Sequence, residues 1–409
     1  MLETALRGLK VLDLSRILAG PWCTQNLSDL GAEVIKVENP KSGDDTRGWG
    51  PPYLGDTTTG AHFSAYFLAC NRGKRSIAIN YAEEEGAELI RRLAADADVV
   101  VENYKTGTLD RYGLGYSRLR AANPRLIHLS ITGFGPTGPM AGKPGYDYVF
   151  QGMGGMMSYT GRPIGSPGDG PLRTGVSVVD LMTGMYATSA VLAALFQRER
   201  TGEGQHIDIT LLDVAVALNA NQGSNYLVSG QVPQPIGNAH ANLAPYEVFA
   251  CSDGHLILAI GNDEQFAAFS ALAGIPQVAE DPRFATNSAR MAHLDALRPL
   301  IASVMATRTR RAWGAGLDAA KISWGPINTL ADVFADPQVV HREVKTSATH
   351  PVVGPVPMVR NPLIAPGTER APQPPPLKGE HSAAILGELG LEPHAVSTLI
   401  DSGIIGTPT

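Results

Sequence analysis

Two kinds of hydrophobic pattern alternate along the first third of the chain. Short aliphatic runs, typical of strands buried on both faces, are followed by segments whose apolar positions recur with helical spacing. Strands separated by single helices in this way predict a parallel sheet with helices on both faces. The expected strands are residues 9–14, 33–38, 76–80, 98–103 and 125–131, and the expected helices are residues 20–31 and 82–97.

The pattern changes after this alternating region. Residues 133–175 are rich in glycine and proline, which predicts long loops. A helix is expected over residues 181–200, ending at the glycine of Thr201-Gly202. Residues 230–245 have the composition of a linker, and residues 246–330 combine strand and helix patterns. The sequence therefore predicts a smaller unit after the alternating region.

Composition narrows the class of protein. The chain has 409 residues, of which 44% are hydrophobic and 18% charged, as in a soluble globular protein. Its net charge is −6 and it has no long basic run, so we expect no nucleic-acid partner. We found no stretch of about 20 residues apolar enough to cross a bilayer, so we expect no membrane contact.

The cysteines and the N-terminal segment bear on the compartment. Cys23, Cys70 and Cys251 are far apart and lie in no metal-binding spacing, so we expect a reducing compartment and no metal. A strand pattern begins almost at the N-terminus, leaving no room for a signal peptide. The expected location is therefore cytoplasmic.

Basic residues gather in loops on one side of the predicted sheet. Lys74 and Arg75 lie in NRGKRS, and Arg47 and Arg111 lie in neighbouring loops. A single basic loop is usually a solvated surface. Three such loops beyond the same strand ends favour a ligand that carries several phosphates.

The segment GFGPTG, residues 133–138, fits the glycine pattern of a dinucleotide-binding loop and follows a strand. The pattern requires a helix directly after it, because the helix N-terminus holds the pyrophosphate. Here PMAGKPG follows instead. The segment is therefore interpreted as a glycine-rich loop.

Asp180 is the one charged residue in a largely apolar stretch, VSVVDLMTGMYATSAVLAAL. Burying an ionised carboxylate costs several kcal/mol unless donors or cations offset it. One explanation is a helix cap, since aspartate readily accepts hydrogen bonds from the first turn of a helix. The other is catalysis, because a poorly hydrated carboxylate is what covalent catalysis by aspartate requires. The two explanations are compatible.

A family resemblance runs from about residue 7 to residue 400, with its motifs in order. The motifs are VLDLSRILAGP, GAEVIKVENPKSGDDTRGW, CNRGKRSIAIN, VVVENYKTGTLDRYG, PGYDYVFQGMGGMMSYTG, VVDLMTGMYA, RERTGEGQHIDITLLD, WGPINTLADVFADPQV and PPPLKGEHS. Together they resemble the class III CoA-transferases, which include formyl-CoA transferase and carnitine CoA-transferase and are related to alpha-methylacyl-CoA racemase. Within the family the chain is most similar to the succinyl-CoA:dicarboxylate, glutarate-type enzymes.

The resemblance implies an α/β fold with a Rossmann-like large domain built on a parallel sheet. It also implies an inserted smaller α+β domain and an interlocked homodimer. The large domain is then formed by residues 1–225 and 331–409, and the small domain with its linkers by residues 226–330.

The family's functional residues map onto this sequence. Asp180 is the implied catalytic residue, and Tyr146 and Asp147 lie beside it, although the family has glutamate where this chain has Asp147. IGNAHAN, residues 236–242, replaces the family's glycine-run loop and makes His240 a further candidate for acyl recognition. The implied CoA-binding residues are Ile17, Leu18, Ala19, Asn71, Lys74, Arg75, Asn103, Tyr104, Arg111 and Tyr112.

The implied reaction moves CoA between two carboxylic acids, with succinyl-CoA as the expected donor. Asp180 would form a mixed anhydride and then an aspartyl-CoA thioester. CoA is then a substrate, and no permanently bound cofactor is expected. The second carboxylate of a dicarboxylic acid needs a cation or several donors, and Arg16, Arg47 and His240 are the candidates.

Two alternatives remain to be tested. Related racemases pair an aspartate with the histidine of a GHD motif, whereas this chain has GYD, with Tyr146 in that position. A tyrosine hydroxyl, with an ordinary pKa of about 10, is a poor general base at neutral pH. A non-catalytic CoA-binding module is the other alternative, but it would not need to keep Asp180.

Overall fold

The computed structural model describes residues 2–368 and 371–408. The chain divides into two compact units. The first comprises Met1–Gly154, Thr174–Leu218 and Asp336–Thr409, and the second Gly155–Arg173 and Asn219–Ala335.

These bounds differ from the boundaries expected at 226 and 331. The second unit also includes Gly155–Arg173, a segment that falls in the large domain by the expected boundaries. Hydrogen bonds tie this segment to later parts of the second unit. The Gly237 N–H donates to the Gly161 carbonyl at 3.0 Å, and the Tyr159 hydroxyl donates to Asn219 Oδ1 at 2.9 Å. Contacts between residues so distant in sequence leave no local pattern to predict them.

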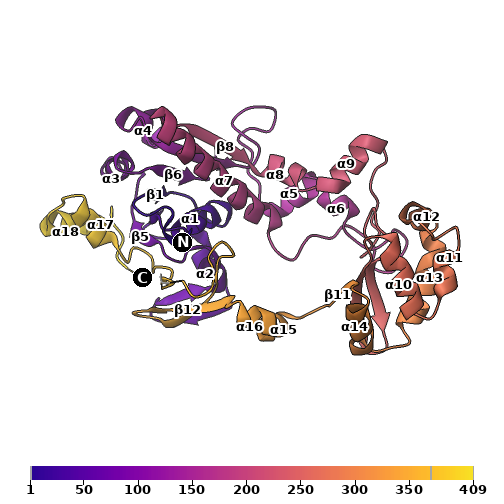
Figure 1. The fold of residues 1–409 in the computed structure, drawn as a ribbon. Coiled ribbons are helices and arrows are strands. Elements are labelled where there is room, and N and C mark those ends of the chain that lie inside the picture. Colours follow the sequence, from indigo (N-terminus) through magenta and orange to yellow (C-terminus); the bar gives the residue numbers. More distant parts are fainter. Residues whose placement is uncertain (1, 369–370, 409) are drawn as a thin grey trace. The chain divides into compact units, whose positions relative to one another are not determined.

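A six-stranded parallel sheet forms the centre of the first unit, as the alternating pattern predicts (Figure 1). Its spatial order is β5-β2-β1-β6-β7-β8, so the chain builds outward from β1 first on one side and then on the other. This is the doubly wound, Rossmann-like arrangement. The strands are β1 (Lys10–Asp13), β2 (Glu33–Glu38), β5 (Arg75–Ala78), β6 (Val99–Glu102), β7 (Ile127–Thr132) and β8 (His206–Thr210).

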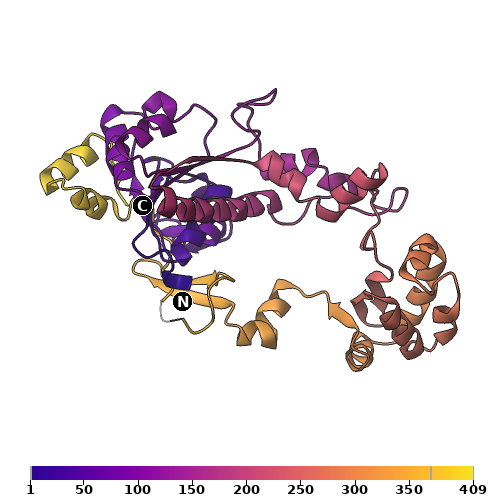
Figure 2. The same cartoon turned by 45° about the horizontal axis from the view of Figure 1, so that its top comes forward.

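Helices cover both faces of this sheet (Figures 1 and 2). α1 (Ala19–Asp29) and α7 (Val178–Thr201) pack on one face through buried residues that include Leu27 and Val191. α3 (Glu84–Ala95) and α4 (Tyr116–Ala122) pack on the other, together with α17 (Ser382–Glu388) and α18 (Pro393–Asp401).

The last residues of the chain complete the first unit beside β5. The Gly406 N–H donates to the Ala78 carbonyl and the His381 N–H to the Ser76 carbonyl, both at 2.9 Å. The C-terminal part therefore returns to the sheet. The remaining α-helices and strands of this unit are β3 (Tyr53–Gly55), β4 (His62–Ser64), α2 (Ala65–Cys70), α5 (Asp147–Met153), α8 (Leu211–Ala217), α16 (Pro337–His341), β12 (Lys345–His350) and β13 (Gly354–Val359).

The second unit is built on an antiparallel sheet in the order β11-β10-β9. Its core includes the fully buried side chains of Phe269 and Trp313. The strands are β9 (Tyr246–Cys251), β10 (Gly254–Ala259) and β11 (Ser323–Pro326). The helices are α6 (Met156–Tyr159), α9 (Ala220–Ser229), α10 (Asp263–Leu272), α11 (Pro276–Glu280), α12 (Asn287–Ala292), α13 (Leu294–Met305), α14 (Arg310–Ala319) and α15 (Leu330–Ala335).

One sequence expectation fails at α7. This helix has 24 residues and is apolar enough to cross a membrane by length and composition, whereas the sequence analysis expects no such stretch. It is a helix of the first unit's core, where Ala187 and Val191 are fully buried, and core helices of soluble proteins meet the same criterion.

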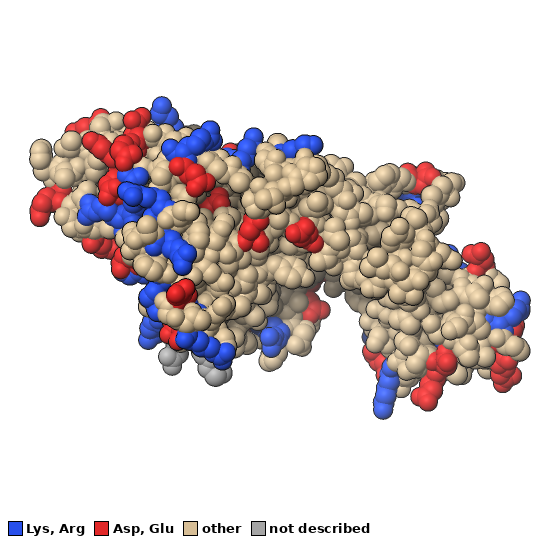
Figure 3. Space-filling model, turned by 90° about the horizontal axis from the view of Figure 1, so that it is seen from above, with Lys and Arg blue, Asp and Glu red and all other residues tan. Residues whose placement is uncertain are grey.

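Lys and Arg side chains lie beside Asp and Glu side chains on the face shown in Figure 3.

Candidate functional site

A cavity opens where the direction of strand addition reverses, between β1 and β6. In doubly wound sheets this is where loops diverge and ligands bind. The cavity has a volume of about 330 Å³, and the loops that follow β1, β6 and β7 form its walls. It is lined by Arg16, Ile17, Leu18, Ala19, Asn103, Tyr104, Lys105, Thr106, Ile131, Thr132, Gly133, Phe134, Gly135, Gly142, Lys143, Pro144, Gly145, Tyr146, Asp180 and Leu211.

Asp180 lies in the first turn of α7 and faces this cavity. The expectation that it caps the helix is wrong, because the helix begins at Val178 and the cap position is Ser177. Asp147 takes the capping role from outside. Its Oδ1 accepts the N–H of Val179 at 2.8 Å and the N–H of Asp180 at 3.2 Å.

Asp147 is itself buried and held in place. Gln151 donates from Nε2 to Asp147 Oδ2 at 2.6 Å, and Gln151 Oε1 accepts the Thr174 N–H at 3.0 Å. A carboxylate that accepts two N–H groups at a helix N-terminus both satisfies unpaired donors and fixes the direction of the helix. Asp147 therefore holds the backbone of the turn that carries Asp180.

Burial raises the pKa of Asp180 to about 7, and the nearby charge of Asp147 adds to the effect. A substantial fraction of Asp180 is therefore ionised at neutral pH. Its carboxylate is poorly hydrated, which makes it a better nucleophile than an aspartate in water.

Close packing brings α7 against the first turn of α1. A Cβ atom at Gly184 would lie 2.8 Å from the Ala19 carbonyl oxygen and 2.9 Å from Trp22 Cδ1. Only glycine permits this approach, which places Asp180 and Ala19 on the same cavity.

The loop after β1 has an unusual backbone at Ile17, with φ of 72°. This left-handed conformation is strained for a β-branched residue and persists only when the surroundings enforce it. The Ile17 N–H points to both carboxylate oxygens of Asp44 at 3.3 Å, and the Cys70 thiol donates to the Ile17 carbonyl at 3.5 Å.

A buried ionic network supports this loop from below. Lys74 Nζ donates to Asp13 Oδ2, to the Pro21 carbonyl at 3.0 Å and to Asn71 Oδ1 at 2.9 Å. Lys36 Nζ pairs with Asp44 Oδ2 at 2.8 Å and donates to the Ser15 carbonyl at 2.9 Å. Burial alone would raise the pKa of Asp13, but the charges of Lys74 and Lys36 outweigh it and lower that pKa to about 2.

The cavity brings together many of the residues expected from the sequence. Its walls contain Asp180, Tyr146, Arg16, Ile17, Leu18, Ala19, Asn103 and Tyr104. Asp147 lies behind Asp180, and Asn71 and Lys74 lie beneath the loop after β1. Arg75 pairs instead with Glu33 and Glu388, Arg111 contacts Thr108 at 3.5 Å, and the Tyr112 ring contacts Tyr81 with centroids 5.6 Å apart.

The three candidates for a distal carboxylate differ in their surroundings. Arg47 donates twice to buried Glu38 at 2.7 Å and lies 3.7 Å from the centre of the Phe67 ring, so its charge is engaged. Arg16 lines the cavity, and its partner Asp45 is an exposed one. His240 belongs to the second unit, where its Nδ1 accepts the Asn242 N–H at 3.0 Å.

Sequence reasoning missed two lysines and the glycine-rich wall. Lys105, Lys143 and Gly133–Gly135 line the cavity. The glycine segment lacks the following helix of a dinucleotide-binding loop, so its pattern does not predict a ligand site. A signal was available, since both Lys105 and the glycines directly follow predicted strands of the parallel sheet. Among the described residues, no group of His, Cys, Asp and Glu side chains is arranged to hold a metal ion.

The ionic network generates a prediction about stability. Lys74→Ala leaves Asp13 buried without its cation, and we expect the free energy of unfolding at pH 7 to fall by about 3–5 kcal/mol. Urea unfolding measures this. The control is Lys105→Ala, an exposed lysine on the cavity wall, expected to change stability by less than about 0.5 kcal/mol. Equal effects of the two substitutions would contradict the supporting role of Lys74.

Comparison with known proteins identifies the family. The model of CoA-transferase family III matches residues 6–382. A succinate–glutarate CoA-transferase of Agrobacterium fabrum is 49% identical over 94% of this chain and 95% of its own. The human succinyl-CoA:glutarate CoA-transferase is 39% identical over 98% of this chain and 90% of its own.

A solved structure agrees with these relatives. A CAIB/BAIF family protein from Brucella suis is 50% identical, covers 94% of this chain and 98% of its own, and superposes with a TM-score of 0.82. The resemblance inferred from the motifs is confirmed. The chain belongs to CoA-transferase family III and is an enzyme of that family.

Proposed function

We propose that this enzyme transfers CoA from succinyl-CoA to a small dicarboxylic acid, with Asp180 as the covalent carrier. The observation that carries the proposal is a partly buried carboxylate with a raised pKa, on a glycine-lined cavity at the sheet's switch point. The substrate class follows from the relatives, whose names specify succinate, succinyl-CoA and glutarate.

The proposed reaction has four steps. The Asp180 carboxylate attacks the thioester carbonyl, which forms a succinyl-aspartyl anhydride and releases CoA thiolate. The thiolate attacks the aspartyl carbonyl, which forms an aspartyl-CoA thioester and releases succinate. The acceptor carboxylate attacks that thioester to give a second anhydride and free thiolate. The thiolate then attacks the acceptor's carbonyl, which forms the new acyl-CoA and restores Asp180.

Each step passes through a tetrahedral oxyanion next to Asp180. Backbone N–H groups of the glycine-rich wall, including Gly133 and Gly145, are the donors proposed to stabilise it. Asp147 keeps the first turn of α7 in place while the Asp180 carbonyl carbon changes geometry. The burial that raises the pKa of Asp180 also limits access of water, which would hydrolyse an anhydride.

CoA enters as a substrate, and no permanently bound cofactor is proposed. Ile17, Leu18, Ala19, Asn103 and Tyr104 line the path to Asp180, and the exposed cations Lys105 and Lys143 are suited to phosphate groups. Arg16 is proposed to bind the distal carboxylate of the acid. Its exposed ion pair with Asp45 contributes little to stability, so Arg16 can exchange that partner for a substrate.

We also propose an interlocked homodimer in the cytoplasm. Along α7, the side chains of Tyr186 and Phe196 are 47% and 62% exposed, and Val216 of α8 is 56% exposed. A second copy of the chain would cover this apolar surface. The three cysteines are free and buried, which suits a reducing compartment.

The central prediction concerns the nucleophile. Asp180→Ala should abolish transfer, because no carboxylate remains to carry the acyl group, while the affinity for CoA stays within about threefold. An acyl-CoA mass-spectrometry assay with succinyl-CoA and a panel of dicarboxylic acids measures transfer, and calorimetry measures CoA binding. Borohydride added during wild-type turnover should modify Asp180 alone. Retained turnover in the variant contradicts the mechanism.

The same assay separates the alternative functions. A racemase forms no new acyl-CoA and exchanges the proton next to the thioester of a branched acyl-CoA. A binding module binds CoA and turns over neither class of substrate. Either result refutes CoA transfer.

A second prediction concerns pH. Asp180 must be ionised to attack, so kcat should fall as the pH drops below about 7. Asp147→Asn removes a repelling charge and keeps an oxygen acceptor for α7, so the acid limb of the kcat profile should move to lower pH. Asp147→Ala removes the acceptor as well and should lower kcat by about 10²-fold. Identical profiles in Asp147→Asn and wild type would contradict this electrostatic coupling.

A third prediction concerns acid recognition. Arg16→Gln should raise the KM for a dicarboxylic acceptor by about tenfold or more and leave that of a monocarboxylic analogue nearly unchanged. Arg47→Gln is the matched control for charge, although it also breaks the pair with Glu38. The thermal stability of Arg47→Gln should fall. Its preference for the dicarboxylic over the monocarboxylic acceptor should equal that of the wild type. A selectivity unchanged in Arg16→Gln excludes the proposed contact.

A further inference from the structure

A buried glutamate lies directly behind the loop that separates two cavities. Glu102 is the last residue of β6 and is 8% exposed. Its Oε2 accepts the Tyr104 N–H at 2.7 Å. Asn103 and Tyr104 line the Asp180 cavity, whereas Glu102 lines a second cavity of about 210 Å³. Lys105 and Thr106 contribute to both cavities, so the loop forms a thin wall between them.

This loop is joined to the loop after β1 across the switch point. Asn103 Oδ1 accepts the Arg16 N–H at 2.9 Å, and Asn103 Nδ2 donates to the Arg16 carbonyl at 2.6 Å. The Arg16 guanidinium lies 5.7 Å from the centre of the Tyr104 ring. Movement of the Tyr104 backbone would therefore disturb both loops that line the Asp180 cavity.

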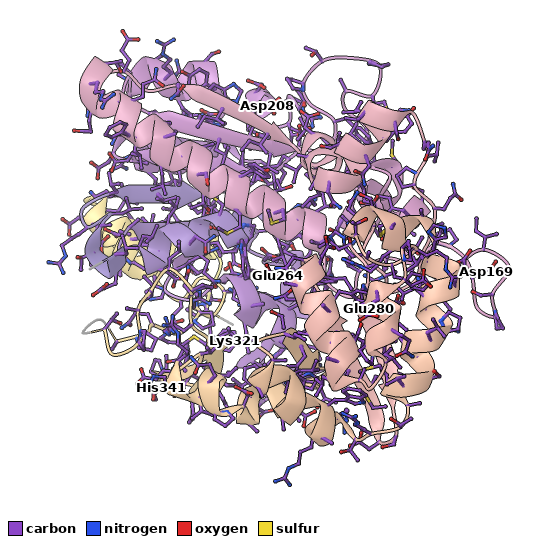
Figure 4. The ribbon with its side chains drawn as sticks, turned by 45° about the vertical axis from the view of Figure 1, so that its right-hand side comes forward. Asp169, Asp208, Glu264, Glu280, Lys321 and His341 are labelled. Atoms are coloured by element: carbon purple, nitrogen blue, oxygen red, sulfur yellow. The ribbon has the colours of Figure 1, made fainter. Side chains whose placement is uncertain are left out.

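Glu102 lies beside polar side chains of β7 and β8, which alternate along these strands with the aliphatic side chains of the other face of the sheet. The Ser130 hydroxyl hydrogen-bonds to Glu102, and Ser130 Oγ lies 2.9 Å from His206 Nε2. The parallel register places His128 opposite His206 and Ser130 opposite Asp208. Figure 4 labels Asp208, which marks β8 in that view. His206 is stacked on Tyr116, with centroids 5.0 Å apart.

These groups form a chain that responds to the charge on Glu102. When Glu102 is ionised, it accepts hydrogen bonds from the Ser130 hydroxyl and the Tyr104 N–H. When Glu102 is protonated, it no longer requires the Ser130 donor, and its hydrogen bond from Tyr104 loses the assistance of the charge.

We propose that Glu102 is a positioning residue for the acyl-CoA site, which holds the Asn103–Thr106 loop in its CoA-binding position through the Tyr104 N–H. The inference rests on the proposed CoA-transferase function and adds a residue that touches neither CoA nor the reacting atoms. The ionised form of Glu102 holds the loop more firmly than the neutral form.

The surroundings place the titration of Glu102 in the physiological range. Burial raises its pKa to about 7, although the hydrogen bonds from Ser130 and the Tyr104 N–H act in the opposite direction. Of the groups around the same cavity, Asp208 and Asp110 raise that pKa further. The cavity is also lined by Lys105, His206 and His128, and burial lowers the pKa of His128 to about 3, so His128 is neutral.

In this proposal the pH dependence of KM comes from Glu102 and that of kcat from Asp180. The KM for acyl-CoA in the wild type should rise as the pH falls through about 7, because Glu102 becomes protonated. The kcat follows Asp180, which must be ionised to attack.

The experiment uses Glu102→Gln, which keeps an oxygen acceptor and removes the charge. At pH 8 its KM for acyl-CoA, and its Kd for CoA by calorimetry, should be about fivefold above those of the wild type. At pH 6 the two proteins should agree within about twofold, since the wild-type residue is then largely neutral. The kcat profile should keep the wild-type midpoint.

Two further variants keep the test decisive if Glu102→Gln folds poorly. Ser130→Ala removes a hydrogen bond that favours the ionised form, so the midpoint of the KM profile should move to higher pH. Asp110→Asn removes another carboxylate of the same cavity and keeps the Glu102–Tyr104 bond. It should retain the wild-type KM at pH 8 and move the midpoint to lower pH.

Measurements of CoA binding and of turnover distinguish a failure of the proposed CoA-transferase function from a failure of the positioning role of Glu102. If the wild type transfers no CoA, the proposed function fails, while the CoA titrations still test Glu102. If the wild type transfers CoA and Glu102→Gln binds it equally well at pH 6 and pH 8 with the wild-type Kd, the positioning role is refuted. A loss confined to kcat also refutes it.

Discussion

The contact between Lys74 and Asp13 beneath the first βα loop is the interaction on which the Asp180 cavity depends. Both side chains are buried, and the same lysine also binds the Pro21 carbonyl and Asn71. A buried ion pair of this kind is costly to break, because each charge would be left in a low-dielectric interior. The strained backbone at Ile17 lies in the same loop, where Asp44 and Cys70 hold it.

Three structural features then converge on one carboxylate. The strand order creates a switch point between β1 and β6, close packing at Gly184 brings α7 to it, and Asp147 fixes the first turn of that helix. Asp180 is thereby held in a place too poorly hydrated for an ordinary aspartate. Its raised pKa is the consequence of that location, and the nucleophilic role proposed for Asp180 depends on it.

Much of the fold could be predicted because it depends on local patterns. The aliphatic runs of β1 and β2 and the amphipathic α3 have short periods that a sequence displays directly. Motif order correctly identified the family, and Asp180 does line a cavity at the expected sheet edge. The prediction that Asp180 caps the helix was wrong because Asp147 supplies the cap. Asp147 lies 33 residues away in the sequence, so no local pattern around the helix start indicates it.

Other features depend on contacts that no short pattern contains. Lys74 and Arg47 have the appearance of ligand-binding residues in their loops, yet the fold engages them with Asp13 and Glu38. A lysine or arginine can bind a ligand only if no carboxylate from a distant part of the chain pairs with it in the fold. The pairing of Gly161 with Gly237, which assigns Gly155–Arg173 to the second unit, is equally invisible in the sequence.

The discontinuity of the first unit has a consequence for synthesis on the ribosome. All six strands of its sheet have been made once Thr210 is reached, but Ile385 and Leu386, which cover the β5 side, come near the end of the chain. Most of the second unit, Asn219–Ala335, is translated in between. On this face α3 and α4 are already available, but the apolar part beside β5 stays uncovered until the C-terminal helices are made. Chaperones are the natural protection at that stage.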